Sequence, residues 1–158
     1  MNPFPAIHIF IRPFPSANTI LISGKNPLLI DPGFGSHTDI SALEAWLSEQ
    51  GVTPQQMEGM RVVNTHYHTD HSGANHYLQQ EYGAVIYAHT IDAESVNRAD
   101  PALGKRLWLD QPLDNYRVDI ELQDGDLLEA EDARLEVIYL PGHTQGMIGL
   151  YHAESGGI

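Results

Sequence analysis

The chain has 158 residues, 42% of them hydrophobic, and 21 acidic against 8 basic side chains give a net charge of −13. This length and apolar content are typical of one folded domain and argue against disorder. The strong negative charge argues against nucleic acid and anionic membranes as partners.

Cysteine is absent, which excludes disulfides and thiolate metal ligands. The first residues show no basic segment followed by an apolar one, so no secretory signal is visible. No apolar run approaches the roughly 18 residues of a membrane helix. We therefore expect a soluble cytoplasmic protein.

Runs rich in apolar or β-branched residues, bounded by glycine, proline or aspartate, predict strands along most of the chain. These runs cover residues 6–11, 19–23, 28–30, 60–63, 84–88, 118–122, 127–128, 135–140 and 147–151. The first two are expected to form an antiparallel pair. Asp124-Gly125 carries the signal of a hairpin turn.

Two longer helices are predicted between the strands. Residues 36–50 have Ser36 as a capping residue and apolar side chains spaced for one face. Residues 72–82 end at Gly83, and a short helix capped by Thr90 follows the next strand. The helix at 72–82 is expected to point its N-terminus, the positive end of its dipole, toward the histidine-rich segment before it.

The pattern is weakest between residues 96 and 118. Trp108 and Tyr116 are its most notable side chains, and they either line an apolar wall of a cleft or pack in the core.

Three histidines and a carboxylate stand within the segment Thr65 to His71, directly after the predicted strand 60–63. Imidazole and carboxylate groups are ligands for zinc, iron or manganese. Side chains alternate along an extended segment, so His66 and His68 point to the same side and can reach one ion at about 2.0–2.1 Å.

A third ligand must come from elsewhere, and the clearest candidate is His143, which also follows a strand-like run. Asp70 and His71 stand on the turn after the first pair. They are expected to hold a second ion or to orient a metal-bound water.

The spacing His-x-His-x-Asp-His after a strand, with Pro-Gly-His-Thr-x-x-Gly about seventy residues later, resembles the metallo-β-lactamase fold superfamily. Leu29-Ile30-Asp31-Pro32-Gly33 and Asp124-Gly125-Asp126 resemble its glyoxalase II and lactonase-like branches. The resemblance implies an α/β (α+β) fold, a four-layer αββα sandwich. Residues 1–158 are expected to be a single domain truncated at its C-terminal end. Asp31 then lies either near the metal or simply in a turn.

Family members usually continue into a Ser/Thr-Gly-Asp segment and a late histidine that complete the second metal site, and neither is present here. We therefore expect one zinc site on His66, His68 and His143, with iron or manganese as alternatives. A second site on Asp70 and His71 is expected to be weak or empty. The uncovered face of an incomplete sandwich predicts a homo-oligomer in which another copy covers it.

The resemblance implies a hydrolase that uses metal-bound hydroxide on a small ester, thioester or lactone. Asp70 is the expected catalytic residue, aligning the water. Two alternatives stay open: an iron-dependent persulfide dioxygenase, and a catalytically inactive domain that binds metal or a protein partner.

Overall fold

The computed structural model describes residues 6–98, 115–131 and 133–153. Its larger sheet comprises β1 (Ile7–Phe10), β2 (Thr19–Ile22), β3 (Leu28–Ile30), β4 (Arg61–Val63), β5 (Val85–His89) and β6 (Ile120–Leu122). The smaller sheet comprises β7 (Leu127–Ala130), β8 (Ala133–Tyr139) and β9 (Ile148–His152). The helices are α1 (His37–Glu49), α2 (Pro54–Met57), α3 (Thr69–Ser72), α4 (Asn75–Tyr82) and α5 (Thr90–Asn97).

The larger sheet runs in chain order from β1 to β6. Strands β1 to β3 pair antiparallel, as expected for the first two, whereas β3, β4, β5 and β6 pair in parallel. In the parallel register, Ile30 lies opposite Val63 and Val63 opposite Tyr87. The segments that follow β3, β4 and β5 therefore emerge at the same edge of the sheet, where the site described below is built.

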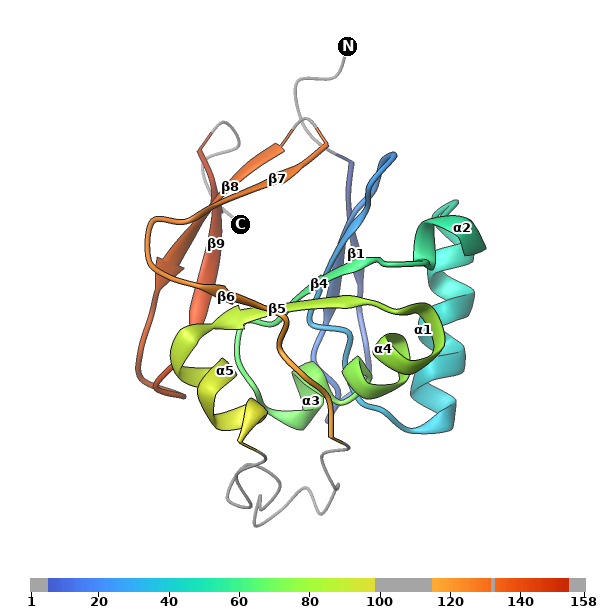
Figure 1. The fold of residues 1–158 in the computed structure, drawn as a ribbon. Helices are drawn as coiled ribbons and strands as arrows, with labels where there is room; N and C mark the ends of the chain where they lie inside the picture. The colour runs from blue at the N-terminus through green and yellow to red at the C-terminus, as the bar shows by residue number, and fades with distance from the viewer. Residues whose placement is uncertain (1–5, 99–114, 132, 154–158) are drawn as a thin grey trace.

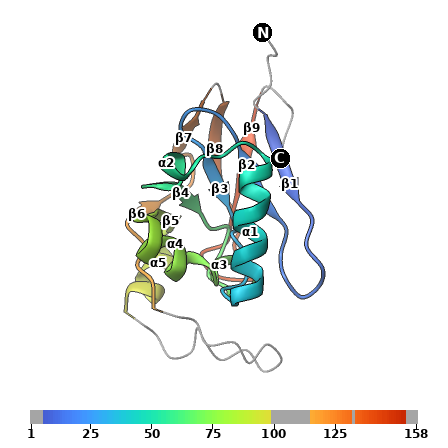
Figure 2. The same cartoon turned by 90° about the vertical axis from the view of Figure 1, so that its right-hand side faces the viewer.

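Helices cover one face of the larger sheet and the smaller sheet packs on the other (Figures 1 and 2). On the helix side, the sheet residues Val62 and Ile86 share a core with Leu43 and Leu47 of α1. On the other side, β2 to β4 pack against Leu135 and neighbouring residues of the smaller sheet. The described residues thus form helix, sheet and sheet layers, which is the expected αββα sandwich without its fourth layer.

Helix α1 forms as its local sequence predicts. The Ser36 side chain accepts a hydrogen bond from the Asp39 backbone N–H at 3.2 Å and so satisfies a donor at the exposed helix start. Leu43 and Leu47, four residues apart, lie on one face and are buried. The predicted helix over 36–50 is therefore confirmed within one residue at each end.

The prediction of one helix over residues 72–82 was wrong at its start. A single turn, α3, precedes Gly73, and α4 begins only at Asn75. At this junction the Ala74 N–H donates to the Gly33 carbonyl at 2.9 Å rather than to a helical partner. The interruption means that residues 72–82 do not form one continuous helix. Gly83 does end α4, with φ +62°.

The predicted hairpin at Asp124-Gly125 was also wrong. Strand β6 pairs with β5 of the larger sheet, whereas β7 pairs with β8 of the smaller one. The turn, with Gly125 at φ +81°, therefore carries the chain from one sheet to the other. Tyr116 is only 7% exposed and packs in the helix-side core, so the packing interpretation holds for it. Trp108 lies outside the described residues.

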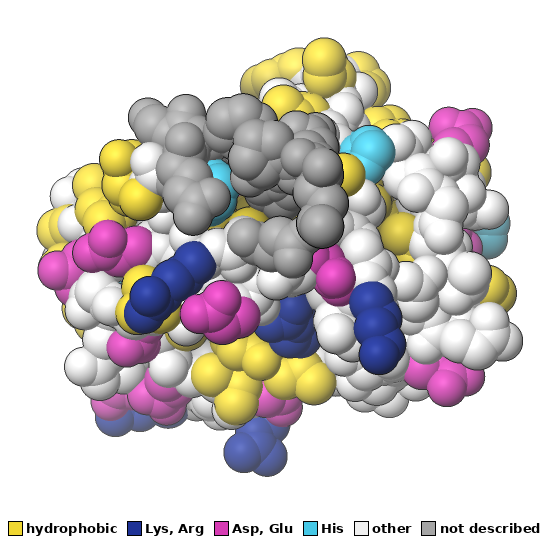
Figure 3. Space-filling view, turned by 90° about the horizontal axis from the view of Figure 1, so that it is seen from above, with side chains coloured by type: hydrophobic (Ala, Val, Ile, Leu, Met, Phe, Trp, Pro, Cys, Tyr) yellow, Lys and Arg dark blue, Asp and Glu magenta, His cyan; other side chains and the backbone are white. Residues whose placement is uncertain are grey.

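The surface seen in Figure 3 shows Lys and Arg side chains lying apart from one another among acidic and uncharged groups. The described part of that face has no continuous basic patch. Among the described helices, none has the length and apolarity needed to cross a membrane.

Candidate metal centre

The segment from Asn64 to His71, here called the first histidine loop, is fixed at its start to the ends of the neighbouring strands. The Asn64 N–H donates to the Tyr87 carbonyl at 2.9 Å. Asp31 accepts two bonds from Thr65, one from its N–H at 2.8 Å and one from its hydroxyl at 2.7 Å. Asp31 is itself 5% exposed and has φ +51°, a conformation that Asp tolerates better than most residues. Both interpretations of Asp31 are therefore combined: it forms a turn and supports the first histidine loop.

The segment from Leu140 to Met147, here called the second histidine loop, connects β8 to β9. It is closed by a hydrogen bond from the Leu140 N–H to the Met147 carbonyl at 2.9 Å. Directly after it, the Ile148 N–H donates to the Thr65 carbonyl at 2.9 Å. The backbone thus joins the two histidine loops at one point, although they belong to different sheets.

His66, His68 and His143 come together between the two loops. One ring nitrogen from each lies within 4.8 Å of the others, and Nδ1 of His68 is 3.0 Å from Nε2 of His143. The His66 ring centroid lies 4.6 Å from that of His68 and 4.9 Å from that of His143. His66 is buried, His68 is half-buried and His143 is exposed, so one side of the cluster is open to solvent.

This donor set fits a zinc ion. Tetrahedral zinc with nitrogen ligands at 2.0–2.1 Å places its ligand atoms about 3.4 Å apart. Nδ1 of His68 and Nε2 of His143 are close to that spacing, and one nitrogen of each of the three rings lies within 4.8 Å of the others. Three neutral imidazoles also leave one tetrahedral position for water or substrate.

Asp70 and His71 lie beside this cluster but outside it. The ring of His71 packs on that of His66, with centroids 4.1 Å apart. Its Nδ1 is 2.8 Å from Oδ2 of Asp31, and its Nε2 is 3.5 Å from Oδ2 of Asp70. Burial disfavours the charged form of His71, but the hydrogen bond and charge of Asp31, together with Asp70, outweigh it and raise the pKa.

The structure adds one residue that the sequence did not single out. Asp92, in the first turn of α5, is 1% exposed and accepts a hydrogen bond from the Tyr67 N–H of the first histidine loop at 3.1 Å. The Gly146 N–H and the Thr144 hydroxyl of the second histidine loop also face its carboxylate. Burial nevertheless raises the pKa of Asp92 to about 6. An isolated Asp in a short helix gives no signal in the sequence from which this position could be recognised.

Two further histidines, outside the cluster, have other partners. His89 caps α5, where its Nδ1 accepts from the Ile91 N–H at 3.3 Å, and its ring stacks on Tyr139. Its pKa is lowered by burial, with a smaller opposing effect of Asp124. His76 of α4 bonds to the Asn115 carbonyl through Nδ1 at 2.7 Å.

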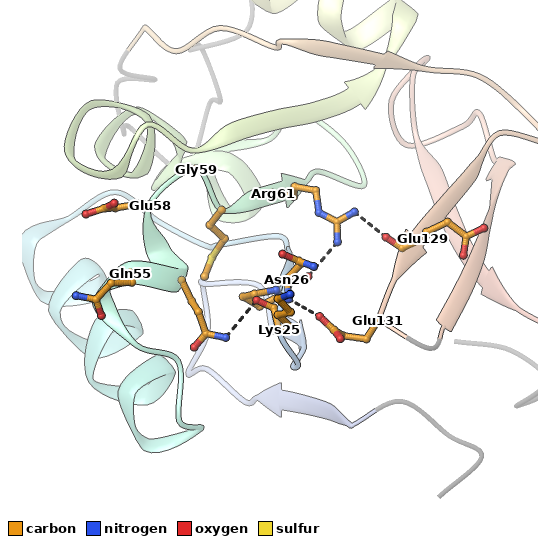
Figure 4. A pocket seen from close by; sticks show the side chains of 11 residues that line it. Lys25, Asn26, Gln55, Glu58, Gly59, Arg61, Glu129 and Glu131 are labelled. Carbon is orange, nitrogen blue, oxygen red and sulfur yellow. Dashed lines mark hydrogen bonds between the residues drawn. The ribbon is translucent and has the colours of Figure 1, made fainter. Parts of the chain in front are cut away.

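A cavity of about 550 Å³ lies at the opposite end of the parallel strands, beside the residues that precede β3 and β4. Arg61 crosses it, donating to the Glu129 carbonyl at 2.6 Å and to the Asn26 carbonyl at 3.0 Å (Figure 4). Asn26 in turn donates its N–H to Glu131. This network links the two sheets and is separate from the histidine cluster.

Comparison with known proteins gives one family match. The model of the metallo-beta-lactamase superfamily matches residues 12–158. In sequence, the chain is 27% identical to a hydroxyacylglutathione hydrolase of Maricaulis maris, covering 95% of this chain and 49% of the relative. It is 28% identical to the acyl-coenzyme A thioesterase MBLAC2 of Gallus gallus, covering 87% of this chain and 54% of the relative.

Solved structures agree at the level of the fold. A subclass B3 metallo-beta-lactamase of Bradyrhizobium japonicum superposes with a TM-score of 0.72 at 20% identity, over 85% of this chain and 50% of the other. The chain thus spans about half the length of the relatives that it matches.

Proposed function

The chain belongs to the metallo-beta-lactamase superfamily, and from this premise we propose that it supports metal-dependent hydrolysis of a small thioester, ester or lactone. The observation that carries the proposal is the approach of His66, His68 and His143 from two separate loops. When bound there, a zinc ion supplies Lewis acidity and lowers the pKa of water toward ~7.

The protein's own groups then have distinct proposed roles. The three imidazoles hold the ion and leave the exposed side of the cluster for substrate. Asp70 is half-buried beside the cluster, and we assign it the task of accepting a hydrogen bond from the attacking water and orienting it. His71, bonded to Asp31, positions Asp70 through its second nitrogen. A second ion on Asp70 and His71 would need further ligands, so we propose that this site is weak.

A thioester is the favoured substrate class. The names of the relatives from Maricaulis maris and Gallus gallus both denote hydrolysis of a thioester, of glutathione in one and of coenzyme A in the other. The fold itself does not select the substrate. The thioester assignment therefore rests on sequence similarity, and the metal chemistry rests on the cluster.

The donor set also bears on the iron-dependent alternative. Mononuclear iron oxygenases of the facial-triad type use two histidines and one carboxylate. Among the described residues, the group that could hold an ion consists of three imidazoles. Zinc hydrolysis is therefore favoured over persulfide oxygenation, and metal analysis of the purified chain distinguishes the two.

The test is a hydrolysis assay on the zinc-loaded chain with a hydroxyacylglutathione, an acyl-coenzyme A, a lactone and a β-lactam. We expect turnover of at least one thioester, lost in His66→Ala and lowered by roughly 10²- to 10⁴-fold in Asp70→Asn. His76→Ala, which changes a histidine outside the cluster, serves as the control and retains activity. A zinc-loaded chain with no turnover would instead favour the inactive metal-binding alternative.

We also propose that the chain forms one domain and self-associates. Both cores use the larger sheet, which ties the described parts together. On its β1 edge, Ile7 and Ile9 are 38% and 58% exposed and lie on the face that carries the smaller sheet. A second copy that covers this edge would remove them from water. Light scattering on the eluting peak of a sizing column should give a dimer or larger species, and a monomer would refute the proposal.

A further inference from the structure

Asp92 contacts both histidine loops from a third element of the fold. Helix α5 is anchored to the sheet through Ala93 and Val96, which are buried in the helix-side core. Its N-terminus is fixed by His89, which caps it. The Asp92 carboxylate is therefore held by a rigid element that belongs to neither loop.

On one side, Oδ2 of Asp92 accepts the N–H of Tyr67, which stands between His66 and His68, at 3.1 Å. On the other side, the carboxylate faces the Gly146 N–H, three residues beyond His143, which stabilises its charged form. The backbone of Gly146 lies directly against the carboxylate, because a Cβ at this position would be 2.1 Å from Oδ1 of Asp92. Two separate oxygens thus face two separate loops.

We propose that Asp92 is a positioning residue that holds the two histidine loops together and so sets the spacing of His66 and His68 from His143. This inference rests on the proposed metal site and deepens it. A carboxylate suits this task because it offers two acceptor oxygens, whereas an asparagine side chain offers one acceptor and a donor. Burying a carboxylate at 1% exposure is costly unless such donors surround it, which is the arrangement seen here.

The variant Asp92→Asn removes one acceptor with almost no change in volume. Its amide group would face a backbone N–H, so one of the two loops would lose its contact. Gly146→Ala changes the contact between Asp92 and the second histidine loop on the side of the loop. The carboxylate stays in place, and the added Cβ forces the second histidine loop away from it. Asp119→Asn is the matched control: Asp119 accepts the Ile86 N–H at 2.9 Å and Gln79 at 3.0 Å, linking β5 to α4 away from both loops.

Two readouts are needed on each folded variant. Competition with a chromophoric chelator measures zinc affinity, and amide hydrogen exchange of the metal-free protein measures protection at Tyr67 and Gly146. We expect Asp92→Asn and Gly146→Ala to weaken zinc binding roughly 10- to 100-fold, the range for partners that orient metal ligands. At least one of the two amides should exchange faster in each. Asp119→Asn should leave both readouts unchanged while lowering thermal stability.

A folded Asp92→Asn with the zinc affinity and amide protection of the unmodified chain would overturn the inference. If Asp92→Asn does not fold, the same two measurements on Gly146→Ala replace it, and unchanged zinc affinity and amide protection in that variant would overturn the inference. A chain that binds no zinc at all would refute the proposed metal site, and the exchange data alone would then show whether Asp92 joins the loops. The experiments therefore distinguish failure of the proposed metal site from failure of the proposed role of Asp92.

Discussion

Nδ1 of His68 lies 3.0 Å from Nε2 of His143, although 75 residues separate them in the chain. They come from loops on different sheets, and a hydrogen bond between Ile148 and Thr65 joins these loops directly. At this distance the two nitrogens form an N–H···N hydrogen bond when one of them carries a proton, and two deprotonated nitrogens placed this way can instead bind one cation. The proposal of a metal site therefore rests on the third imidazole, His66, which lies within reach of the same point.

Removing one histidine of the cluster should abolish tight zinc binding. His143→Ala leaves two ligands, so the loss should exceed the roughly 10- to 100-fold expected from a supporting residue. Because His143 is exposed, the fold should remain intact. Isothermal titration with zinc measures the effect, with His76→Ala as control. Equal affinities in the two variants would show that His143 is not a ligand.

Asp31→Asn should lower stability and zinc affinity together. Asp31 accepts from the Thr65 N–H, the Thr65 hydroxyl and Nδ1 of His71, and an asparagine offers one acceptor for these donors. Asparagine tolerates the positive φ of this position, so the variant adds little backbone strain. We expect a loss of about 2 kcal/mol in the free energy of unfolding.

The control for this change is Asp126→Asn. Its carboxylate accepts the Gln123 N–H at 2.7 Å in an exposed turn, where water can replace the lost contact. Urea unfolding should separate the two variants clearly. Similar losses in both would mean that Asp31 does no more than form a turn.

Gly35→Ala should destabilise the chain because two backbone segments meet there. A Cβ on Gly35 would lie 2.4 Å from the Gly73 carbonyl, next to α3 and the first histidine loop, and neither backbone can move freely. The cost of such overpacking is about 1–3 kcal/mol or more. Gly142→Ala is the matched control, since its Cβ meets nothing within 4 Å. Denaturant midpoints of the two variants should differ, and coinciding midpoints would contradict the close approach.

Burial of Asp92 predicts a definite pH dependence of stability. Its pKa is raised from 3.8 to about 6, so between these values the folded chain binds more protons than the unfolded one. The free energy of unfolding should therefore fall as pH rises from about 4 to 6, relative to Asp92→Asn, by at most about 3 kcal/mol. Burial is the main cause that raises the pKa of Tyr116 to about 12, and the charge of Asp92 adds a smaller increase. Tyr116 therefore stays neutral over this pH range.

Urea unfolding of the metal-free proteins at several pH values measures this difference. The remaining titrating groups are common to both proteins, so their effects largely cancel. A difference that stays constant from pH 4 to 6, or grows in the opposite direction, would show that Asp92 is not desolvated in the folded state.

Local signals predicted those parts of the fold that depend on local contacts. The cap at Ser36 and the leucines of α1 predicted that helix, and the spacing of His66 and His68 after a strand predicted two of the three histidines of the cluster. His143 was found because its own loop follows a strand.

Features that depend on tertiary contacts were missed. The turn at Gly125 looks the same whether it joins strands of one sheet or of two. The break between α3 and α4 depends on a hydrogen bond from Ala74 to Gly33, which stands 41 residues earlier in the chain. Asp92 acquires its role only where Tyr67 and Gly146 meet it.

The most direct test of the metal centre is an anomalous difference map from a crystal of the zinc-loaded chain, recorded at the zinc absorption edge. We predict a single strong peak about 2.0–2.1 Å from one ring nitrogen each of His66, His68 and His143. A map with no peak among these imidazoles, or with the second histidine loop turned away from the first, would contradict the proposed chemistry.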